Sequence, residues 1–416
     1  MNEDRDELRI LAPREMKPKL DYLHREVQRA AGRRLDRRQA LGLGGMALLA
    51  TAAAACGTTT TTSGGTSKSP SGAPANPLAG KPLENHLEIY NWSQYDDPST
   101  FTKFAKLPAE KKVGMTTHET FYSSNDELLA KLHAGGTGYD IIVPSQNAVA
   151  ELIQEKGLMA LDKALLPNLK NLDPSFLKPS YDPTGNYHVI KDFGITMFFY
   201  NNKIVTEHPA TMLDFYHALP KFVSKGRTNL LDGAEEVVPL ALMALQLDPN
   251  TSSQTDFNTV KSFLFSIRKG VTTIDSSSYI NDAIAGKIIL SQGWNGDVRR
   301  IVQGRKKQGD ITAVIPLAAS EIWADNWAIP VSAPHPVAAH AWINWLLTPS
   351  TAVTEMNYHN YKIPMPSALA QLPAALRNDP MFNVPKSYTN SYHYILNVSP
   401  HVVEARTQIY SEFKAA

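Results

Sequence analysis

Residues 87–98 read LEIYNWSQYDDP and open the part of the chain that has a folded character. Apolar and polar positions alternate up to Tyr90 and Trp92 and a polar turn follows, which predicts a short strand running into a loop. In open α/β sheets, ligands bind beyond the carboxyl ends of the strands. Trp92 and Tyr95 stand at such an end, and rings beside polar groups suit a flat or cationic ligand. The alternative is that both rings only complete the hydrophobic core.

Strand-like and helix-like segments alternate from this stretch onward. Residues 193–200 (FGITMFFY) are an extended apolar run that is expected to cross from one lobe to another. Before this run the expected elements are helices at 98–107, 125–134 and 149–156 and strands at 113–121 and 139–145. After it they are strands at 228–231, 287–291, 312–315 and 321–330, and helices at 234–247, 255–269, 279–285, 298–303, 334–347, 350–358 and 402–414. This βαβα order predicts an α/β fold with a parallel sheet.

The beginning of the chain predicts an export signal. Six arginines crowd residues 25–38, and a run of small and apolar residues follows at 41–55. This run is too short and too rich in Ala and Gly to span a bilayer permanently. Residues 36–41 (DRRQAL) resemble a twin-arginine signal, which implies a bacterial protein exported in the folded state. The stretch before Arg33 is longer than most signals need, so it is either a misassigned start or a cytosolic extension.

Cys56 is the single cysteine, so no internal disulfide can form. Its position after three alanines resembles a bacterial lipoprotein cleavage site, which makes residues 1–56 a lipoprotein signal and Cys56 the lipidated residue. Ala53 stands where the usual pattern has Leu, and the alternative is an ordinary signal peptide with an incidental cysteine. Residues 57–83 are dominated by Thr, Ser, Gly, Pro and Ala and predict a flexible tether. The expected protein is a globule on a lipid anchor outside the cytoplasmic membrane.

Length and charge limit what the remainder can be. Residues 84–416 are long enough for two domains with a sizeable core. Thirty of the 41 basic residues and 32 of the 40 acidic ones lie after Ala55, and this near-neutral balance argues against nucleic acid as a partner. No other stretch is long and apolar enough to cross a membrane.

Familiar enzyme signatures are missing from the sequence. It contains no HExxH, no GxSxG, no Walker loop and no GxGxxG after a strand. The twelve histidines are scattered, and without cysteine ligands a structural zinc site is not expected.

What recurs is an aromatic residue close to a carboxylate where a strand is expected to end. Singly, each acid is typical of a helix start or a solvated strand, but several together at strand ends indicate a binding cleft. Two such pairs are Trp294 with Asp297 and Trp323 with Asp325. In addition, the acids Asp232 and Glu236 are four residues apart, a spacing that places both on one face of a helix.

Five motifs, in this order, make the chain similar to the substrate-binding proteins of polyamine ABC transporters, the putrescine- and spermidine-binding family. The motifs are YNWSQY at 90–95, GYDIIVPS at 138–145, NLDP at 171–174, GWNGD at 293–297 and WADNWAIP at 323–330. The resemblance runs from Leu87 to the C-terminus. It implies a type II periplasmic-binding-protein-like α/β fold, with two lobes that are joined by crossing hinge strands and close on the ligand. Lobe 1 would comprise 84–194 and about 328–370, and lobe 2 would comprise 195–327 and about 371–416.

The resemblance also implies which residues bind the ligand. Carboxylates would pair with the ammonium groups, whose burial is otherwise costly, and aromatic faces would cover the methylene chain. The implied set is Trp92, Ser93, Tyr95, Ser145, Asp232, Glu236, Trp294, Asp297, Trp323, Asp325 and Tyr361.

Three positions depart from the family pattern and leave the particular polyamine open. Gly233 stands where spermidine binders often carry an acid, and the adjacent Asp232 is expected to substitute for it. Gln94 stands where putrescine-type members often have Asp. Asn147 replaces a common tyrosine.

The sequence therefore predicts an exported, lipid-anchored and monomeric binding protein that captures putrescine or spermidine and delivers it to an ABC permease. No catalysis, cofactor or metal is expected. The alternatives are a binding protein for another cationic or polar solute, a purely structural lipoprotein, or a secreted glycoside hydrolase. The hydrolase stays open because tryptophans with paired carboxylates also describe a sugar cleft.

Overall fold

The computed structural model describes residues 78–135, 138–317, 319–389 and 392–416. These residues belong to one compact unit, Pro74–Ala416. The predicted signal with Cys56, and residues 57–77 of the predicted tether, lie outside the described residues. Within the described part, no helix has both the length and the apolar composition needed to cross a bilayer.

A three-stranded parallel sheet forms around the strand expected at the start of the fold. Its strands are β1 (His86–Trp92), β2 (Thr116–Tyr122) and β3 (Ile141–Ile142), in the order β2-β1-β3. The helices that connect or follow them are α3 (Pro98–Ala105), α4 (Pro108–Val113), α5 (Asn125–His133) and α6 (Gln146–Gln154). The predicted βαβ order is confirmed.

Two of the predicted helices of this sheet, α3 and α5, begin where polar side chains cap them. The Asp97 carboxylate accepts from the Ser99 backbone N–H at the start of α3, and the Ser124 hydroxyl accepts from the Glu127 N–H at the start of α5. The strand expected at 139–145 is shorter, because beyond β3 the chain makes isolated bridges to another segment. One of these bridges places Ser145 opposite Asp325.

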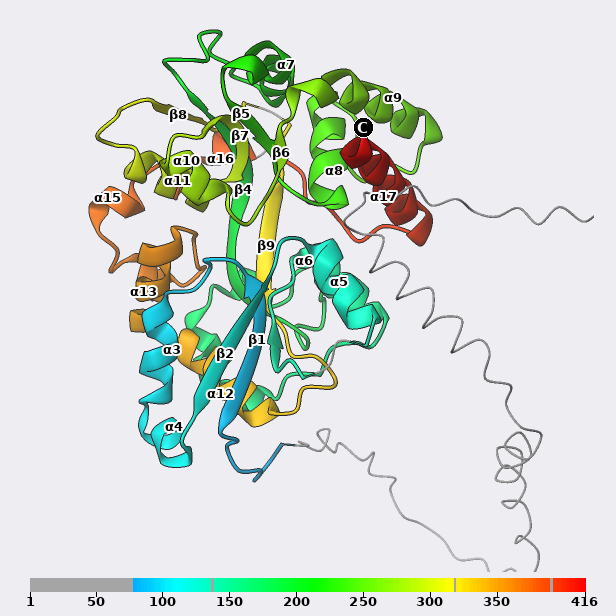
Figure 1. The fold of residues 1–416 in the computed structure, drawn as a ribbon. Coiled ribbons are helices and arrows are strands. Elements are labelled where there is room, and N and C mark those ends of the chain that lie inside the picture. Colours follow the sequence, from blue (N-terminus) through cyan, green and yellow to red (C-terminus); the bar gives the residue numbers. More distant parts are fainter. Residues whose placement is uncertain (1–77, 136–137, 318, 390–391) are drawn as a thin grey trace, which may run out of the picture. The chain divides into compact units, whose positions relative to one another are not determined.

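The apolar run expected to cross between lobes is the long strand β4 (Val189–Asn201). Its first half pairs antiparallel with β9 (Ile322–Trp327), and its second half pairs antiparallel with β7 (Ile288–Trp294) and β8 (Ile311–Val314). Figure 1 shows β4 and β9 side by side, between the region of β1 and β2 and the region of β5 and β7. The pair therefore connects the two sheets.

The second sheet is mixed and has six strands. Its order is β6-β5-β7-β4-β8, with β9 paired to β4, and it includes β5 (Arg227–Leu230) and β6 (Thr273–Ile274), both parallel to their partners. Its helices are α7 (Met212–Phe222), α8 (Ala234–Ala244), α9 (Gln254–Ile267), α10 (Tyr279–Ile284) and α11 (Asn295–Gly304).

Among the described residues six more helices follow, and the last of them packs against helices of the second sheet. They are α12 (Pro336–Leu346), α13 (Pro349–His359), α14 (Pro366–Leu369), α15 (Ala374–Arg377), α16 (Lys386–Thr389) and α17 (Pro400–Ala415). Helix α17 lies against α8 and α9 (Figure 1). The 3-10 helices are Lys163–Leu165, Pro167–Asn171, Pro174–Phe176, Val223–Lys225 and Arg268–Gly270.

Two large hydrophobic cores stabilise the fold. The first lies around the fully buried Trp342, which stacks on Phe101, and it includes residues of β1 and β9. The second lies around Phe198 and Tyr216 and includes Phe413 of α17. Because β4 contributes to both cores, its position fixes the two sheets relative to each other. The residue boundaries of the lobes remain predictions.

Candidate functional site

A pocket lies at the ends of several strands and receives residues from both sheets. Trp92 is the last residue of β1, Tyr122 of β2 and Trp294 of β7, as expected for a site beyond the carboxyl ends of strands. Ten of the eleven predicted residues line it: Trp92, Ser93, Tyr95, Ser145, Glu236, Trp294, Asp297, Trp323, Asp325 and Tyr361. That a ligand contacts them remains a prediction.

Asp325 is a carboxylate of the pocket that has hydrogen-bonding neighbours at both of its oxygens. It lies on β9, and the Ser145 hydroxyl donates to its Oδ1 at 2.6 Å. The Tyr95 hydroxyl oxygen lies 2.7 Å from its Oδ2 and also contacts Asp192 of β4. Burial and the charge of Asp192 raise the pKa of Asp325 to about 7. Both its oxygens therefore have fixed neighbours before any ligand enters.

Aromatic rings form the walls of the pocket. The Trp92 indole N–H donates to the Val143 carbonyl at 2.9 Å, which fixes the ring, and the ring centroids of Trp92 and Trp294 are 5.7 Å apart. Trp323 meets Tyr361 edge to face, with centroids 5.0 Å apart. Faces of this kind cover an alkyl chain and attract cations.

Asp297 is a second, separately held carboxylate. It lies in the first turn of α11, where the Tyr279 hydroxyl donates to its Oδ2 at 2.8 Å and its own backbone N–H donates to the Tyr361 hydroxyl at 3.3 Å. Burial raises its pKa, and Arg300, at 3.9 Å, lowers it. Asp297 is thus partly compensated before a ligand binds.

Three glutamates form a third acidic group, and only Glu236 was predicted. Glu235 accepts from the Asn147 side-chain amide, and Glu321 accepts from the Thr196 hydroxyl at 3.3 Å. Burial, with neighbouring carboxylates, raises the pKa of Glu235 to about 7, of Glu236 to about 8 and of Glu321 well above its ordinary value. The Glu236 Oε2 atom is buried and has no hydrogen-bond partner among the described residues.

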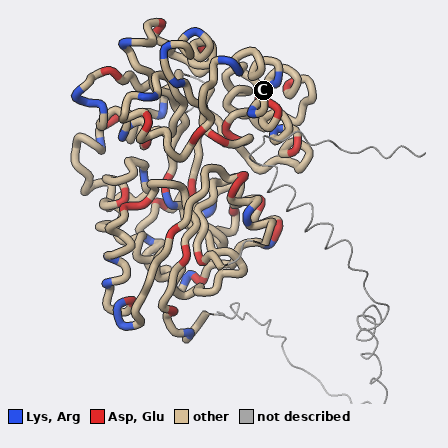
Figure 2. The backbone as a smooth tube through the Cα atoms, viewed as in Figure 1, with Lys and Arg blue, Asp and Glu red and all other residues tan. Residues whose placement is uncertain are grey.

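These carboxylates give the pocket its chemistry. Glu235, Glu236, Asp297, Glu321 and Asp325 line it, and no Lys or Arg is among its described lining residues. Over the rest of the described chain, acidic and basic residues are interspersed (Figure 2). Buried carboxylates without a counter-ion are unstable in their charged form. The pocket is therefore built for a cation with an apolar body.

Asp232 is the predicted residue that the structure does not bring to the pocket. It accepts from the Tyr410 hydroxyl and lies 3.1 Å from Lys414, both on α17. The next residue, Gly233, has φ 122°, a left-handed value that favours glycine over an acid. The expectation that Asp232 substitutes for an acid at Gly233 is corrected, because packing of α17 turns the carboxylate away.

Asp232→Asn is therefore expected to leave ligand affinity within about twofold of the wild type and to lower stability by less than about 1 kcal/mol. The ion pair with Lys414 is partly exposed, so solvent screens it. Calorimetric titration and thermal unfolding measure the two effects. A loss of affinity above tenfold would return Asp232 to the ligand set.

Seven lining residues are outside the predicted ligand set, and of these only Asn147 was named, as a departure from the family pattern. They are Tyr122, Asn125, Asn147, Glu235, Ser276, Glu321 and Ile395. One signal was present, since Glu321, Trp323 and Asp325 alternate along one face of the β9 segment. Trp327 continues that alternation but belongs to the first core. Ile395 comes from a distant loop and has no local signal.

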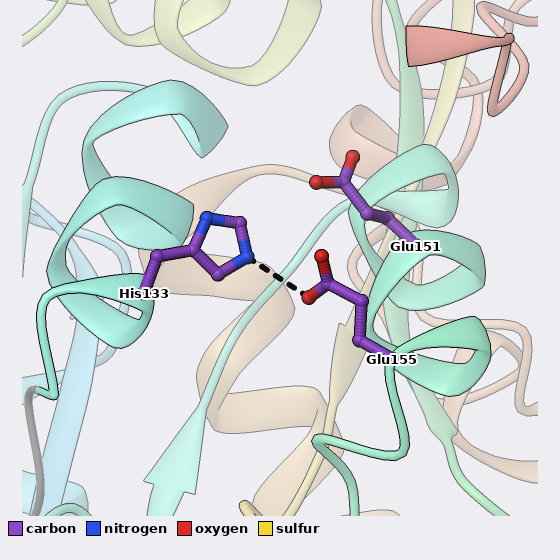
Figure 3. Close-up of side chains that lie close together, drawn as sticks. All are labelled: His133, Glu151 and Glu155. Atoms are coloured by element: carbon purple, nitrogen blue, oxygen red, sulfur yellow. Dashed lines mark hydrogen bonds and ion pairs between the residues drawn. The ribbon is translucent and has the colours of Figure 1, made fainter.

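A separate surface cluster joins His133, at the end of α5, to Glu151 of α6 and Glu155, which directly follows that helix (Figure 3). The potential metal-ligand atoms of these three side chains lie within 4.8 Å of one another. His133 Nε2 and Glu155 Oε2 are 2.9 Å apart and partly exposed, so they satisfy each other without an ion. We assign no ligand to this cluster.

The chain is similar to several solute-binding proteins. A family model described as bacterial extracellular solute-binding protein matches residues 101–383. Spermidine/putrescine-binding periplasmic protein 1 of Haemophilus influenzae is 29% identical over 79% of this chain and 88% of that protein. Putrescine-binding periplasmic protein SpuD of Pseudomonas aeruginosa is 30% identical over 71% of this chain and 82% of that protein. A solved structure from Listeria monocytogenes, assigned to a spermidine/putrescine ABC transporter, has a TM-score of 0.73 and 28% identity, covering 80% of this chain and 99% of that one.

Proposed function

Because the chain belongs to the family of bacterial extracellular solute-binding proteins, we propose that it captures a polyamine in its acidic pocket and delivers it to an ABC permease. The polyamine is putrescine or spermidine, the ligands that the names of its relatives carry. The family is one of binding proteins and not of enzymes, and it acts outside the cytoplasm.

One observation carries this proposal: five carboxylates and three tryptophans line one pocket, without a lysine or arginine among the described lining residues. A polyamine is an apolar chain that carries ammonium ions, so it needs carboxylates for its charges and ring faces for its methylenes. A neutral sugar offers no positive charge to the ionised forms of these carboxyls, whereas an ammonium ion pairs with them. The pocket therefore favours a polyamine over the glycoside-hydrolase alternative.

We also propose that the protein is a monomer anchored to the membrane through a lipid on Cys56, after twin-arginine export. The arginine-rich segment, the apolar run at 41–55 and the tether-like residues 57–83 support this arrangement.

A Cys56→Ser variant is expected to leave the membrane fraction of the producing cells, while its ligand affinity stays unchanged.

Calorimetric titration of the full chain tests the ligand. Putrescine and spermidine are titrated in turn, with lysine, glycine betaine and maltose as controls. Saturable binding of a polyamine, about micromolar or tighter, with no heat from the controls is the expected result. Binding of maltose, or of lysine alone, would assign the pocket to another solute.

A further inference from the structure

The hydroxyl of Tyr95 lies between two buried carboxylates. Its oxygen contacts Asp192 on one side and lies 2.7 Å from Asp325 Oδ2 on the other. The two aspartates are opposite each other in the β4–β9 ladder, and both are at most 7% exposed. A hydroxyl has one proton, so it can donate to one carboxylate only. The lone pairs of the hydroxyl oxygen then face the second carboxyl group, and this contact is favourable only if that carboxyl group carries a proton.

The surroundings decide which aspartate is charged. Lys191, only 2% exposed at its side chain, lies 3.2 Å from Asp192 and 3.7 Å from the centre of the Tyr95 ring. The His359 Nδ1 accepts from the Tyr361 backbone N–H, so the ring proton is on Nε2, which lies 3.5 Å from Asp192. In the described residues, Asp325 has no ion pair. Asp192 is therefore the ionised partner and Asp325 the protonated one.

We infer that Asp192, acting through the Tyr95 hydroxyl, holds a proton on Asp325 in the empty pocket, and that an ammonium group of the ligand displaces this proton into the solvent. In the empty state, the Asp325 carboxyl donates to the Tyr95 oxygen, Tyr95 donates to Asp192, and Lys191 neutralises Asp192. The Asp325 O–H bond breaks and its proton passes to the solvent, so one positive charge leaves the pocket as the ammonium brings one in. Asp192 is a positioning residue, since it does not line the pocket.

Several charged and titratable groups surround the hydrogen-bonded series Asp325–Tyr95–Asp192. Burial and the charge of Asp192 favour protonation of Asp325, and Lys191 opposes it, whereas the nearby Glu236 and Glu321 have raised pKa values and are themselves protonated at pH 6.5. Asp96 Oδ1 lies 3.0 Å from Lys191 Nζ, and this ion pair does not involve the Tyr95 hydroxyl. The remaining groups facing the two aspartates are Tyr122, Tyr181, His359 and Tyr361.

The proposal rests on the proposed function, because it takes an ammonium group as the chemistry of the ligand. It predicts proton release on binding at pH 6.5, where burial and Asp192 keep Asp325 largely protonated. The amines of spermidine are fully protonated at this pH, so the ligand itself contributes no protons. Affinity then rises with pH, by up to about tenfold per pH unit for each proton released.

The experiment is calorimetric titration of the full chain with spermidine at pH 6.5, in phosphate and in ACES, two buffers that titrate near this pH with different ionisation enthalpies. The difference in heat between the two buffers gives the number of protons released per ligand. In Asp192→Asn, the new amide can donate to the Tyr95 oxygen, so Tyr95 donates to Asp325 and favours its ionised form. This variant is expected to release about one proton fewer than the wild type.

Asp96→Asn is the matched control, because it removes a buried carboxylate from the same lysine without touching the Tyr95 hydroxyl. It should release as many protons as the wild type. Equal release from the wild type and Asp192→Asn, or the same decrease in both variants, would overturn the inference. An absence of spermidine binding by the wild type would instead count against the proposed function.

If Asp192→Asn fails to fold, infrared spectra of the wild-type protein with and without spermidine test whether Asp325 loses its proton on binding. The carbonyl band of a protonated carboxylic acid should weaken when spermidine binds. Binding without any loss of that band would also overturn the inference.

Discussion

An Asp325→Asn variant will bind polyamines at least about a hundredfold more weakly than the wild type, a loss on the order of 3 kcal/mol. The substitution removes the carboxylate that would pair with a buried ammonium ion. The empty protein should still fold, because asparagine has the size of a protonated aspartate. Its amide oxygen can accept from Ser145, and its amino group can donate to the Tyr95 oxygen, as the carboxyl does.

Trp92→Ala is the comparison that tests this mechanism. It removes one ring face and is expected to lower the affinity by only about 1 to 2 kcal/mol. Calorimetric titration measures both variants, and thermal unfolding verifies that both are folded. If Trp92→Ala proved the more damaging change, stacking and not charge pairing would dominate binding. The assignment to solute binding would be unaffected.

The stability of the empty protein will fall as the pH rises from 7 to 9, by roughly 4 kcal/mol. Burial raises the pKa of Glu119, Glu236 and Glu355 to about 8, whereas these groups ionise near pH 4.5 in the unfolded chain. The folded state therefore binds more protons in this window, and its advantage is lost as they leave. Each such group contributes about 1.4 kcal/mol per pH unit while only the folded state is protonated.

The change in stability between pH 7 and 9 reports on the carboxylates and not on the histidines. Burial lowers the pKa of His340 and His359, which gives the opposite pH dependence, but only near and below pH 6.5. Chemical denaturation at pH 7, 8 and 9 measures the effect, and Glu236→Gln should decrease the slope. Spermidine should decrease it as well, since an ammonium ion favours the ionised pocket. A stability that rises between pH 7 and 9 would contradict the burial of these acids.

Much of the fold follows from local sequence. Apolar periodicity identified β1, α5 and the long strand β4, because the pattern of burial along an element depends on its own repeat. The helix α7 was missed, although Thr211 and Asp214 form a capping box at its start. Its internal Pro220 interrupts the helical pattern, and the surrounding core tolerates that proline.

The sequence by itself also determined the kind of site, since aromatic and acidic residues at strand ends, with the family motifs, identified ten residues that line one pocket. Only the tertiary structure decided which acids point into it. Asp232 and Glu236 are equivalent by helical spacing, yet α17 draws Asp232 to Lys414 while Glu236 enters the pocket. The sequence also does not reveal that Asp192 lies opposite Asp325 in the sheet, because β4 and β9 are far apart in the chain. The direction and charge of a side chain depend on neighbours that only folding brings together.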